Sequence, residues 1–217
     1  MIKFDQWFLP DGETHLQDWM RQTRRVVKGR FTYQFEKLEA ALAFVPQWRV
    51  AVDVGAHAGL WSYWLARNFE HLHAFEPSDK HRECWIQNML EFSNTTLHAY
   101  ALGDKAGRVS LVTGPSSSGD THVVVDDKAE IHMVTLDSLE LTNVDFIKVD
   151  VEGFEYQVLK GAVETLKREK PVVIVEQKGH EHRYFGAPPQ QALGYLQTLG
   201  MAPMAKPMSG DFIMGWP

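Results

Sequence analysis

The sequence predicts an α/β fold with a doubly wound, mostly parallel sheet, and three observations support this prediction. Short apolar runs of the kind that form buried parallel strands repeatedly end in an acidic residue. Segments with apolar residues at helical spacing alternate with these runs and predict helices on both faces of the sheet. The last two apolar stretches, Met201–Ala205 and Phe212–Trp216, flank Ser209 and Gly210 and predict a closing antiparallel hairpin.

The composition is that of a soluble globular protein. A chain of 217 residues is long enough for one α/β domain and too short for two full-sized ones. The formal charge of −6 argues against a general nucleic-acid-binding surface. Cys84 is the only cysteine, which excludes an intrachain disulfide and a cysteine-based zinc cluster. Because no apolar run approaches the roughly 18 residues of a membrane span and no signal peptide begins the chain, we expect a cytoplasmic protein without a membrane partner.

The first 48 residues predict an N-terminal helical extension, and residues 49–217 predict the sheet domain. Apolar spacing predicts helices over Thr14–Lys28 and Tyr33–Phe44. A basic run in this extension has two interpretations, a lid that holds an anionic ligand or a solvated helix face. The run comprises Arg21, Arg24, Arg25, Lys28 and Arg30.

The chain is organised around a strand, a glycine-containing turn and a helix. Val50–Val54 predicts a buried strand with Asp53 near its end, and Leu60–Phe69 predicts the helix. Between them lies the turn Gly55-Ala56-His57-Ala58-Gly59. Since glycine has no Cβ, such a turn lets a ligand approach the backbone, near the unpaired N–H groups of the helix.

Three kinds of ligand-binding site contain a turn of this type, namely the phosphate loop, the dinucleotide site and the S-adenosylmethionine site. The phosphate loop is excluded because Gly59 is followed by Leu60 and Trp61 rather than by Lys and Ser or Thr. A dinucleotide site requires G-x-G-x-x-G, and the central glycine is missing here. The pattern D-x-G-x-x-x-G resembles motif I of class I methyltransferases that use S-adenosylmethionine. In that interpretation an acid faces the positively charged methionine portion of the cofactor.

The next strand supports an adenosine ligand. His71–Glu76 predicts a strand that ends in Glu76, followed by Pro77 and by a helix from Ser78 to about Leu90. A carboxylate at this position accepts hydrogen bonds from both ribose hydroxyls of a bound adenosine. Nicotinamide dehydrogenases place an acid here as well, so Glu76 indicates adenosine rather than methyl transfer.

The middle of the chain predicts the adenine end of the site and a loop beside it. Thr95–Tyr100 predicts a strand, and Ala101 and Leu102 follow it at the carboxyl edge of the sheet, where an apolar side chain can cover adenine. Arg108–Val112 and Thr121–Val125 alternate as strands do. The polar insert Gly114–Asp120 between them predicts either a mobile lid or a loose hairpin tip.

A second group of acidic residues follows the strand Asp145–Val149. Asp150, Glu152 and Glu155 crowd the same edge of the sheet, where they share protons, a cation or substrate hydroxyls, or else decorate the start of a helix. That helix carries Phe154, Val158, Ala162 and Leu166 every four residues. Pro171–Glu176 predicts another strand ending in an acid, Pro188–Leu199 the last covering helix, and Gly179–Gly186 the acceptor side. A divalent metal on Asp150, Glu152 and Glu176 is chemically reasonable but not favoured, and no metal ligands are assigned.

Together these motifs resemble the FkbM-type methyltransferase family. The resemblance rests on V-D-V-G-A-H-A-G, F-E-P and D-F-I-K-V-D-V-E-G-F-E with V-L-K-G-A, from about Val50 to Glu176. It implies a class I methyltransferase (Rossmann-like) fold with a seven-stranded sheet, S-adenosylmethionine as donor, and O-methylation of a small molecule or glycan. By position it assigns the methionine portion to Asp53 and the Gly55–Gly59 turn, the ribose to Glu76, the adenine region to Ala101 and Leu102, and the closing of the pocket to Asp150.

Methyl transfer to a hydroxyl requires alignment of the reacting atoms and a general base. The candidate bases are Glu152, Glu176, His180 and Asp150. Two alternatives remain, a nicotinamide-dependent oxidoreductase and a non-catalytic module that binds the cofactor or a glycan. A nucleic-acid methyltransferase is disfavoured because the chain lacks an Asn/Asp-Pro-Pro-Tyr/Phe motif. The sequence does not indicate the oligomeric state.

Overall fold

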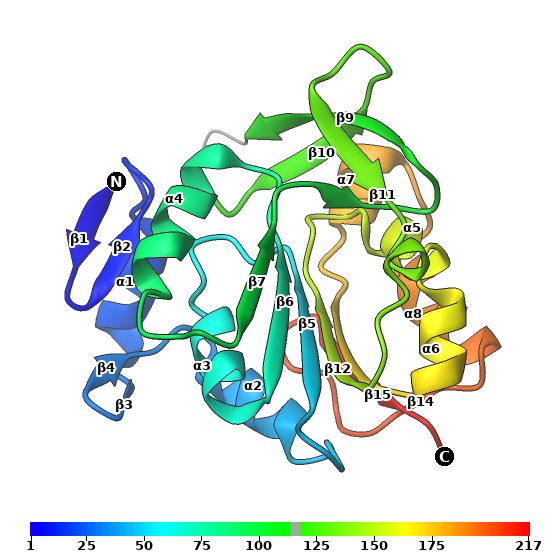
Figure 1. Ribbon diagram of the computed structural model, residues 1–217, viewed down its shortest axis with the longest axis horizontal. Coiled ribbons are helices and arrows are strands. Elements are labelled where there is room, and N and C mark those ends of the chain that lie inside the picture. Colours follow the sequence, from blue (N-terminus) through cyan, green and yellow to red (C-terminus); the bar gives the residue numbers. More distant parts are fainter. Residues whose placement is uncertain (114–117) are drawn as a thin grey trace.

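The computed structural model describes residues 1–113 and 118–217, and a seven-stranded sheet forms its centre (Figure 1). The strand order is β14-β15-β13-β12-β5-β6-β7. The five strands from β13 to β7 are parallel, whereas β15 is antiparallel to β13 and to β14. This confirms the predicted α/β class I methyltransferase fold with its C-terminal hairpin. The strands are β5 (Val50–Val54), β6 (His71–Phe75), β7 (Thr95–His98), β12 (Val144–Val149), β13 (Val172–Glu176), β14 (Ala202–Pro203) and β15 (Asp211–Gly215).

Successive side chains of each strand point to opposite faces of the sheet and contribute to two hydrophobic cores, one on each face. On one face, Ala51, Leu72 and Ile174 pack against helices α2 (Phe35–Leu42), α3 (Ser62–Asn68) and α4 (Asp79–Asn88). On the other face, Val52 and Val173 pack against α5 (Glu155–Lys160), α6 (Val163–Glu169) and α8 (Gln191–Thr198). Burial of both faces explains why the strands are almost continuously apolar.

The prediction of a single helix through Phe154, Val158, Ala162 and Leu166 is wrong, because this segment forms two helices, α5 and α6, with a break between them. Gly161 lies at the break, and a Cβ there would meet the carbonyl oxygen of Gly103 at 1.9 Å. The close approach of a neighbouring chain segment therefore interrupts a helix whose apolar spacing continues.

A second, four-stranded sheet lies above the carboxyl edge of the central one, in the order β10-β9-β11-β8 (Figure 1). It consists of β8 (Ala101–Leu102), β9 (Gly107–Thr113), β10 (Thr121–Val125) and β11 (Ile131–Val134), with the 3₁₀ helix η1 (Asp137–Leu139) after it. The predicted pair over 108–112 and 121–125 is present and antiparallel. The lid predicted over Gly114–Asp120 falls largely on residues 114–117, outside the described residues.

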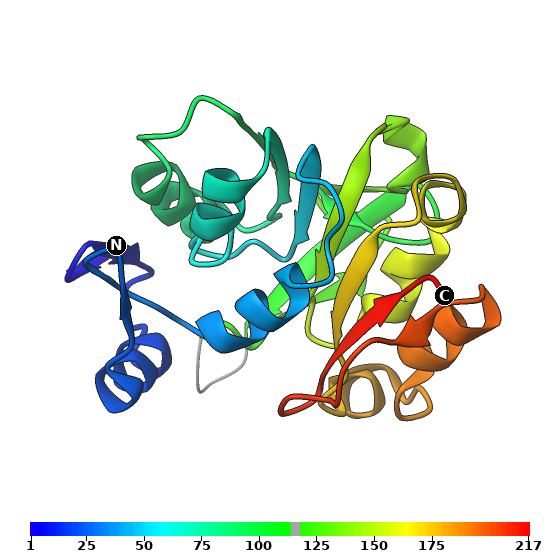
Figure 2. The same cartoon turned by 90° about the horizontal axis from the view of Figure 1, so that it is seen from below.

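The N-terminal extension contains more strand than the sequence predicts. It consists of hairpin β1–β2 (Ile2–Phe4 and Trp7–Leu9), helix α1 (His15–Thr23), hairpin β3–β4 (Val26–Val27 and Arg30–Phe31) and helix α2. The helix predicted to reach Lys28 ends at Thr23, because Arg24 adopts the left-handed conformation with a φ of 48°. Lys28 and Gly29 also have positive φ, 48° and 77°, and form the turn of the following hairpin. Figure 2 shows the first elements set to one side of the sheet, while α2 lies beneath it.

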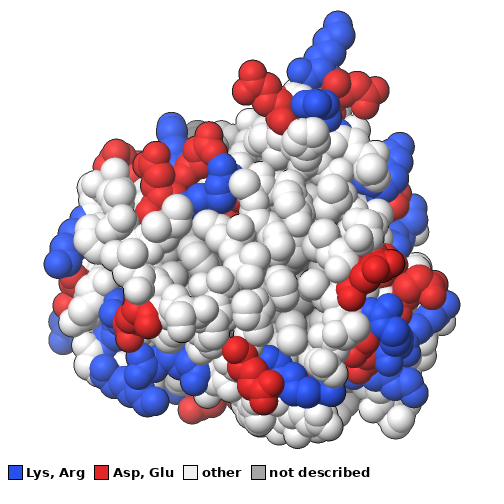
Figure 3. All heavy atoms as spheres, viewed as in Figure 1, with Lys and Arg blue, Asp and Glu red and all other residues white. Residues whose placement is uncertain are grey.

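The described residues contain no helix long and apolar enough to cross a membrane. Charged side chains lie around the rim of the face shown in Figure 3 and leave its centre uncharged. Basic side chains gather at the lower left and lower right of this face, next to acidic ones.

Candidate functional site

A cavity of about 410 Å³ opens at the carboxyl ends of the parallel strands, the edge where ligands bind in open α/β sheets. Nine of the predicted site residues line this cavity. They lie in the loops that follow β5, β6 and β12, at the end of β13, and at the start of α7 (His180–Phe185). These nine are Gly55, Ala56, His57, Glu76, Pro77, Asp150, Glu152, Glu176 and His180. The structure thus brings together residues spread over more than half of the chain.

The other predicted residues lie beside or beneath this cavity. Ala101 and Leu102 are buried and line a smaller adjoining hollow of about 30 Å³ with Phe75 and Tyr100. Asp53 is fully buried and is not among the residues lining either space. Gly59 supports the turn from behind, since a Cβ there would meet the indole of Trp85 at 2.8 Å.

The first three N–H groups of the turn after β5 donate hydrogen bonds to acceptors of the protein itself. Gly55 and Ala56 both donate to the carbonyl oxygen of Phe75, at 3.0 and 3.1 Å. The N–H of His57 donates to Oε2 of Glu76 at 2.8 Å. A pyrophosphate-binding turn needs such groups free to face the ligand, so this geometry disfavours the nicotinamide alternative.

Glu76 forms the carboxylate wall of the cavity. Its oxygens accept from the N–H groups of His57 and Ser78, each at 2.8 Å, and Nδ1 of His81 lies 3.3 Å from Oε1. Burial raises the pKa of Glu76, but the hydrogen bond and charge of His81 outweigh burial, and the net shift is downward. Each carboxylate oxygen keeps accepting capacity, so two ribose hydroxyls can donate to an ionised Glu76.

Two histidines, His57 and His81, contact Glu76. The rings of His57 and His81 lie 4.0 Å apart, and burial followed by the proximity of His81 lowers the pKa of His57 to about 3. A neutral His57 makes a hydrogen bond with Oγ of Ser118 at 2.9 Å, and Ser118 also donates to Glu13. The N-terminal extension and the loop before β10 thereby meet the turn at the mouth of the cavity.

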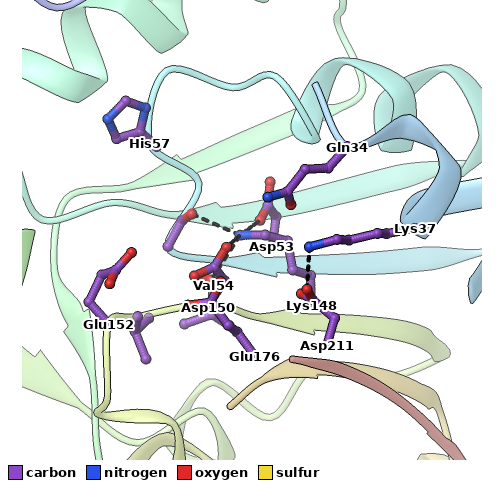
Figure 4. Close-up of polar contacts among 12 residues, drawn as sticks. Gln34, Lys37, Asp53, Val54, His57, Lys148, Asp150, Glu152, Glu176 and Asp211 are labelled. Carbon is purple, nitrogen blue, oxygen red and sulfur yellow. Dashed lines mark hydrogen bonds and ion pairs between the residues drawn. The ribbon is translucent and has the colours of Figure 1, made fainter. Parts of the chain in front are cut away.

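Lys148 is the central residue that sequence reasoning did not find (Figure 4). Its ammonium lies 3.1 Å from Oδ1 of Asp53 and 3.9 Å from Oδ2 of Asp150, and it donates to the carbonyl oxygen of Gly55 at 2.9 Å. Burial lowers the pKa of Lys148, but the two carboxylates raise it further, so the net shift is upward. The signal in the sequence was a lysine between two apolar residues, Ile147 and Val149, of a predicted buried strand.

Acidic groups crowd the opposite end of the cavity. Oε2 of Glu152 lies 2.5 Å from Nδ1 of His180, and Glu176 lies 3.7 Å from the same nitrogen. Burial and then Asp150 raise the pKa of Glu176 well above its usual range. Burial also raises the pKa of Asp150, but the ammonium groups of Lys148 and Lys178 outweigh it and the net shift is downward. Of these two carboxyl groups, Asp150 is therefore the more readily ionised.

The side chain of Glu155, the first residue of α5, contacts the loop before this helix and does not line the cavity. Its Oε1 accepts from the N–H groups of Val151 and Gly153, at 3.1 and 2.9 Å, and the side chain is buried. Burial raises the pKa of Glu155 to about 8 despite these hydrogen bonds. This contact fixes the loop that presents Asp150 and Glu152, in which Glu152 and Gly153 both have positive φ.

Glu152, Glu176 and His180 place ligand atoms within 4.8 Å of one another, a spacing that would suit a metal ion. Lys178, however, makes an ion pair with Glu176, and its ammonium supplies positive charge at this position. The donor set thus has a counter-charge of its own, and the expectation that no metal is bound remains a prediction.

The N-terminal extension completes the cavity wall with His15, Leu16 and Tyr33. Its five predicted basic residues do not line the cavity, and three of them pair with surface acids: Arg21 with Asp18, Arg25 with Glu36 and Glu39, and Arg30 with Glu91. Below Tyr33, Lys37 makes a buried ion pair with Asp211 of β15 (Figure 4). These contributions depend on tertiary contacts that no local pattern reveals.

A family model described as the methyltransferase FkbM domain matches residues 53–203. The chain belongs to the FkbM methyltransferase domain family. This FkbM domain is 28% identical over 133 residues to the hexuronic acid methyltransferase AglP of Haloferax volcanii, a match that covers 58% of this chain and 54% of AglP. The chain therefore spans about half the length of this curated relative.

Solved structures share the fold of this FkbM domain. An FkbM methyltransferase from Methylobacillus flagellatus KT has a TM-score of 0.50 and 21% identity, covering 77% of this chain and 43% of that one. Precorrin-6y C5,15-methyltransferase from Geobacter metallireducens GS-15 has a TM-score of 0.51 and 15% identity, with coverages of 88% and 92%. A putative O-methyltransferase from Klebsiella pneumoniae has a TM-score of 0.52 and 14% identity, with coverages of 94% and 90%.

Proposed function

We propose that this FkbM domain is an S-adenosylmethionine-dependent O-methyltransferase whose acceptor is a hydroxyl group of a glycan or a sugar-like small molecule. Family membership supports methyl transfer, and the relative AglP, named as a hexuronic acid methyltransferase, supports a glycan acceptor. The observation that carries the proposal is a cavity with a buried carboxylate, Glu76, at one end and the pair His180–Glu152 at the other.

The residues around the cavity fit the cofactor. Glu76 would accept the ribose hydroxyls, and the apolar side chains of Ala101 and Leu102, which line the smaller adjoining hollow, would lie beside the adenine without enclosing it. The ionised carboxylate of Asp150 would pair with the methionine ammonium. The backbone at Gly55 leaves no room for a Cβ, because the carbonyl oxygen of Asp150 would lie 1.9 Å from it. When bound, S-adenosylmethionine supplies an electrophilic methyl group.

His180 is the best general base among the four candidates. Glu152 occupies its Nδ1 at 2.5 Å and, with that hydrogen bond as the main cause, raises the pKa of His180. Nε2 is the remaining nitrogen, and it can take the hydroxyl proton while Glu152 stabilises the resulting imidazolium. Glu176 is engaged in its ion pair with Lys178, and the lowered pKa of Asp150 makes it a weak base.

Calorimetry with S-adenosylhomocysteine tests the cofactor, and transfer of a labelled methyl group to sugars tests the reaction. We expect binding of S-adenosylhomocysteine, no change in NADH fluorescence, and a methylated product that survives mild alkali. A product that alkali hydrolyses would be a carboxylate ester and would contradict hydroxyl methylation. A non-catalytic module would bind S-adenosylhomocysteine without methylating any acceptor, and replacement of His180 would change nothing measurable. The cytoplasmic location also remains a proposal, which fractionation of producing cells would test.

A further inference from the structure

Most of the cationic side chains in and behind the cavity wall form an ion pair with a carboxylate. Lys148 pairs with Asp53, Lys178 pairs with Glu176, and behind them Lys37 pairs with Asp211. Arg183 also lines the cavity, yet among the described residues no carboxylate lies within ion-pair distance of its guanidinium. The carbon of its guanidinium lies 5.0 Å from the centroid of the Tyr184 ring. Arg183 therefore contributes an unneutralised positive charge to the cavity wall.

Arg183 stands one helical turn after the proposed base. Both residues belong to α7, His180–Phe185, and both line the cavity. Residues three apart lie on the same helix face and are separated by about 4.5 Å along the axis. An acceptor whose hydroxyl touches His180 would therefore extend past Arg183 at the mouth of the cavity, where the arginine is exposed to solvent.

The neighbouring acids do not satisfy this charge. Asp120 lies on the same wall, but its Oδ1 accepts from the hydroxyl of Tyr184, and it makes no ion pair with Arg183. Glu152 is paired with His180. Deeper in the cavity, ionised Asp150 repels any anionic part of an acceptor, so such a part is favoured only at the mouth.

We propose that Arg183 selects acceptors that carry a carboxylate close to the methylated hydroxyl, as a uronic acid does. The planar guanidinium presents a fork of N–H donors that matches a carboxylate with two parallel hydrogen bonds. The hydroxyl then lies at His180 and the carboxylate at Arg183, which fixes the orientation of the sugar ring. This inference names the acceptor class and rests on the function proposed above.

The test compares two sugars that differ at one group, methyl β-D-glucuronide and methyl β-D-glucoside. Calorimetry is carried out on the full chain saturated with S-adenosylhomocysteine, for the wild type and for Arg183→Gln, Arg183→Lys and Lys105→Gln. Lys105 is an exposed lysine outside the cavity, so Lys105→Gln removes the same charge elsewhere on the surface.

We expect the wild type and Lys105→Gln to bind the glucuronide at least 10-fold more tightly than the glucoside, about 1.4 kcal/mol. Arg183→Gln should abolish this preference, and Arg183→Lys should keep part of it, because a single ammonium lacks the fork. A wild type without preference for the glucuronide, or an Arg183→Gln variant that keeps the preference, overturns the inference. Equal methylation of both sugars overturns it as well but leaves the methyltransferase function intact, whereas failure to bind S-adenosylhomocysteine rejects that function itself.

Discussion

The ammonium of Lys148 lies 3.1 Å from Oδ1 of Asp53, and the two residues stand side by side on the adjacent parallel strands β12 and β5. The second oxygen of Asp53 accepts from the hydroxyl of Ser62 at 2.6 Å. Lys148 also donates to the carbonyl oxygen of Gly55. One buried ion pair thus fixes the tips of both central strands, and with them the turn that borders the cavity.

Replacement of Lys148 by Met should destabilise the protein by about 3 to 5 kcal/mol, because Asp53 would remain as a buried charge without a counter-charge. Urea unfolding measures the change. The double variant Lys148→Met with Asp53→Asn should lose much less stability than the sum of the two single variants. Additive losses would show that the two charges are not energetically coupled.

Replacement of Gly55 by Ala should be far more damaging than replacement of Gly12, although both glycines have a φ of 79°. A Cβ at Gly12 meets nothing within 4 Å, whereas one at Gly55 would meet the carbonyl oxygen of Asp150 at 1.9 Å. The backbone strain of about 1 to 3 kcal/mol is common to both, and the collision is added only at Gly55. Thermal unfolding and the affinity for S-adenosylhomocysteine measure the difference. Equal effects would mean that the turn can move away from Asp150 without cost.

Replacement of His180 by Gln should lower kcat by about 100-fold to 10,000-fold and leave binding of S-adenosylhomocysteine unchanged. A base must be unprotonated, so activity should fall as the pH drops through the pKa of His180, which Glu152 raises. Glu152→Gln should lower that pKa and move the acidic limb of the pH profile to lower pH. A limb that stays in place in Glu152→Gln would assign the titration to another group.

Stability should decrease as the pH rises towards the pKa of about 8 that burial gives Glu155. The folded state retains the proton of Glu155 at pH values where the unfolded chain has lost it. Its stabilising contribution is therefore complete below the ordinary pKa of a glutamic acid and is lost up to pH 8, by at most about 1.4 kcal/mol per pH unit. Unfolding of Glu155→Gln over the same pH range should lack this slope, because an amide does not titrate there, while its oxygen can still accept the two N–H groups. An unchanged slope would contradict the assignment.

Local patterns were sufficient to predict the strands and the acids at their ends. Glu76 and Glu176 follow or end apolar runs, and such runs determine which edge of a parallel sheet a residue reaches. Lys148 was not found, since its role depends on partners such as Val54, 94 positions away. Tyr33 was missed for the same reason, because nothing within its own segment indicates that it borders the cavity. Arg183 lies within Gly179–Gly186, the segment predicted to line the acceptor side, but was not singled out there. The β3–β4 hairpin was missed although Lys28-Gly29 is a turn signal, because the preceding residues have helical spacing.

The ion pair of Lys37 with Asp211 joins residues 174 positions apart, and both side chains are only 6% exposed. A ribosome-bound chain that lacks β15 cannot neutralise Lys37, so α2 has a strong electrostatic reason not to dock until β15 has been synthesised. Tyr33, just before α2, then reaches its place on the wall only after β15 as well. The nascent polypeptide therefore completes the wall of the cavity only once β15 has emerged, and removal of β15 should leave that cavity open.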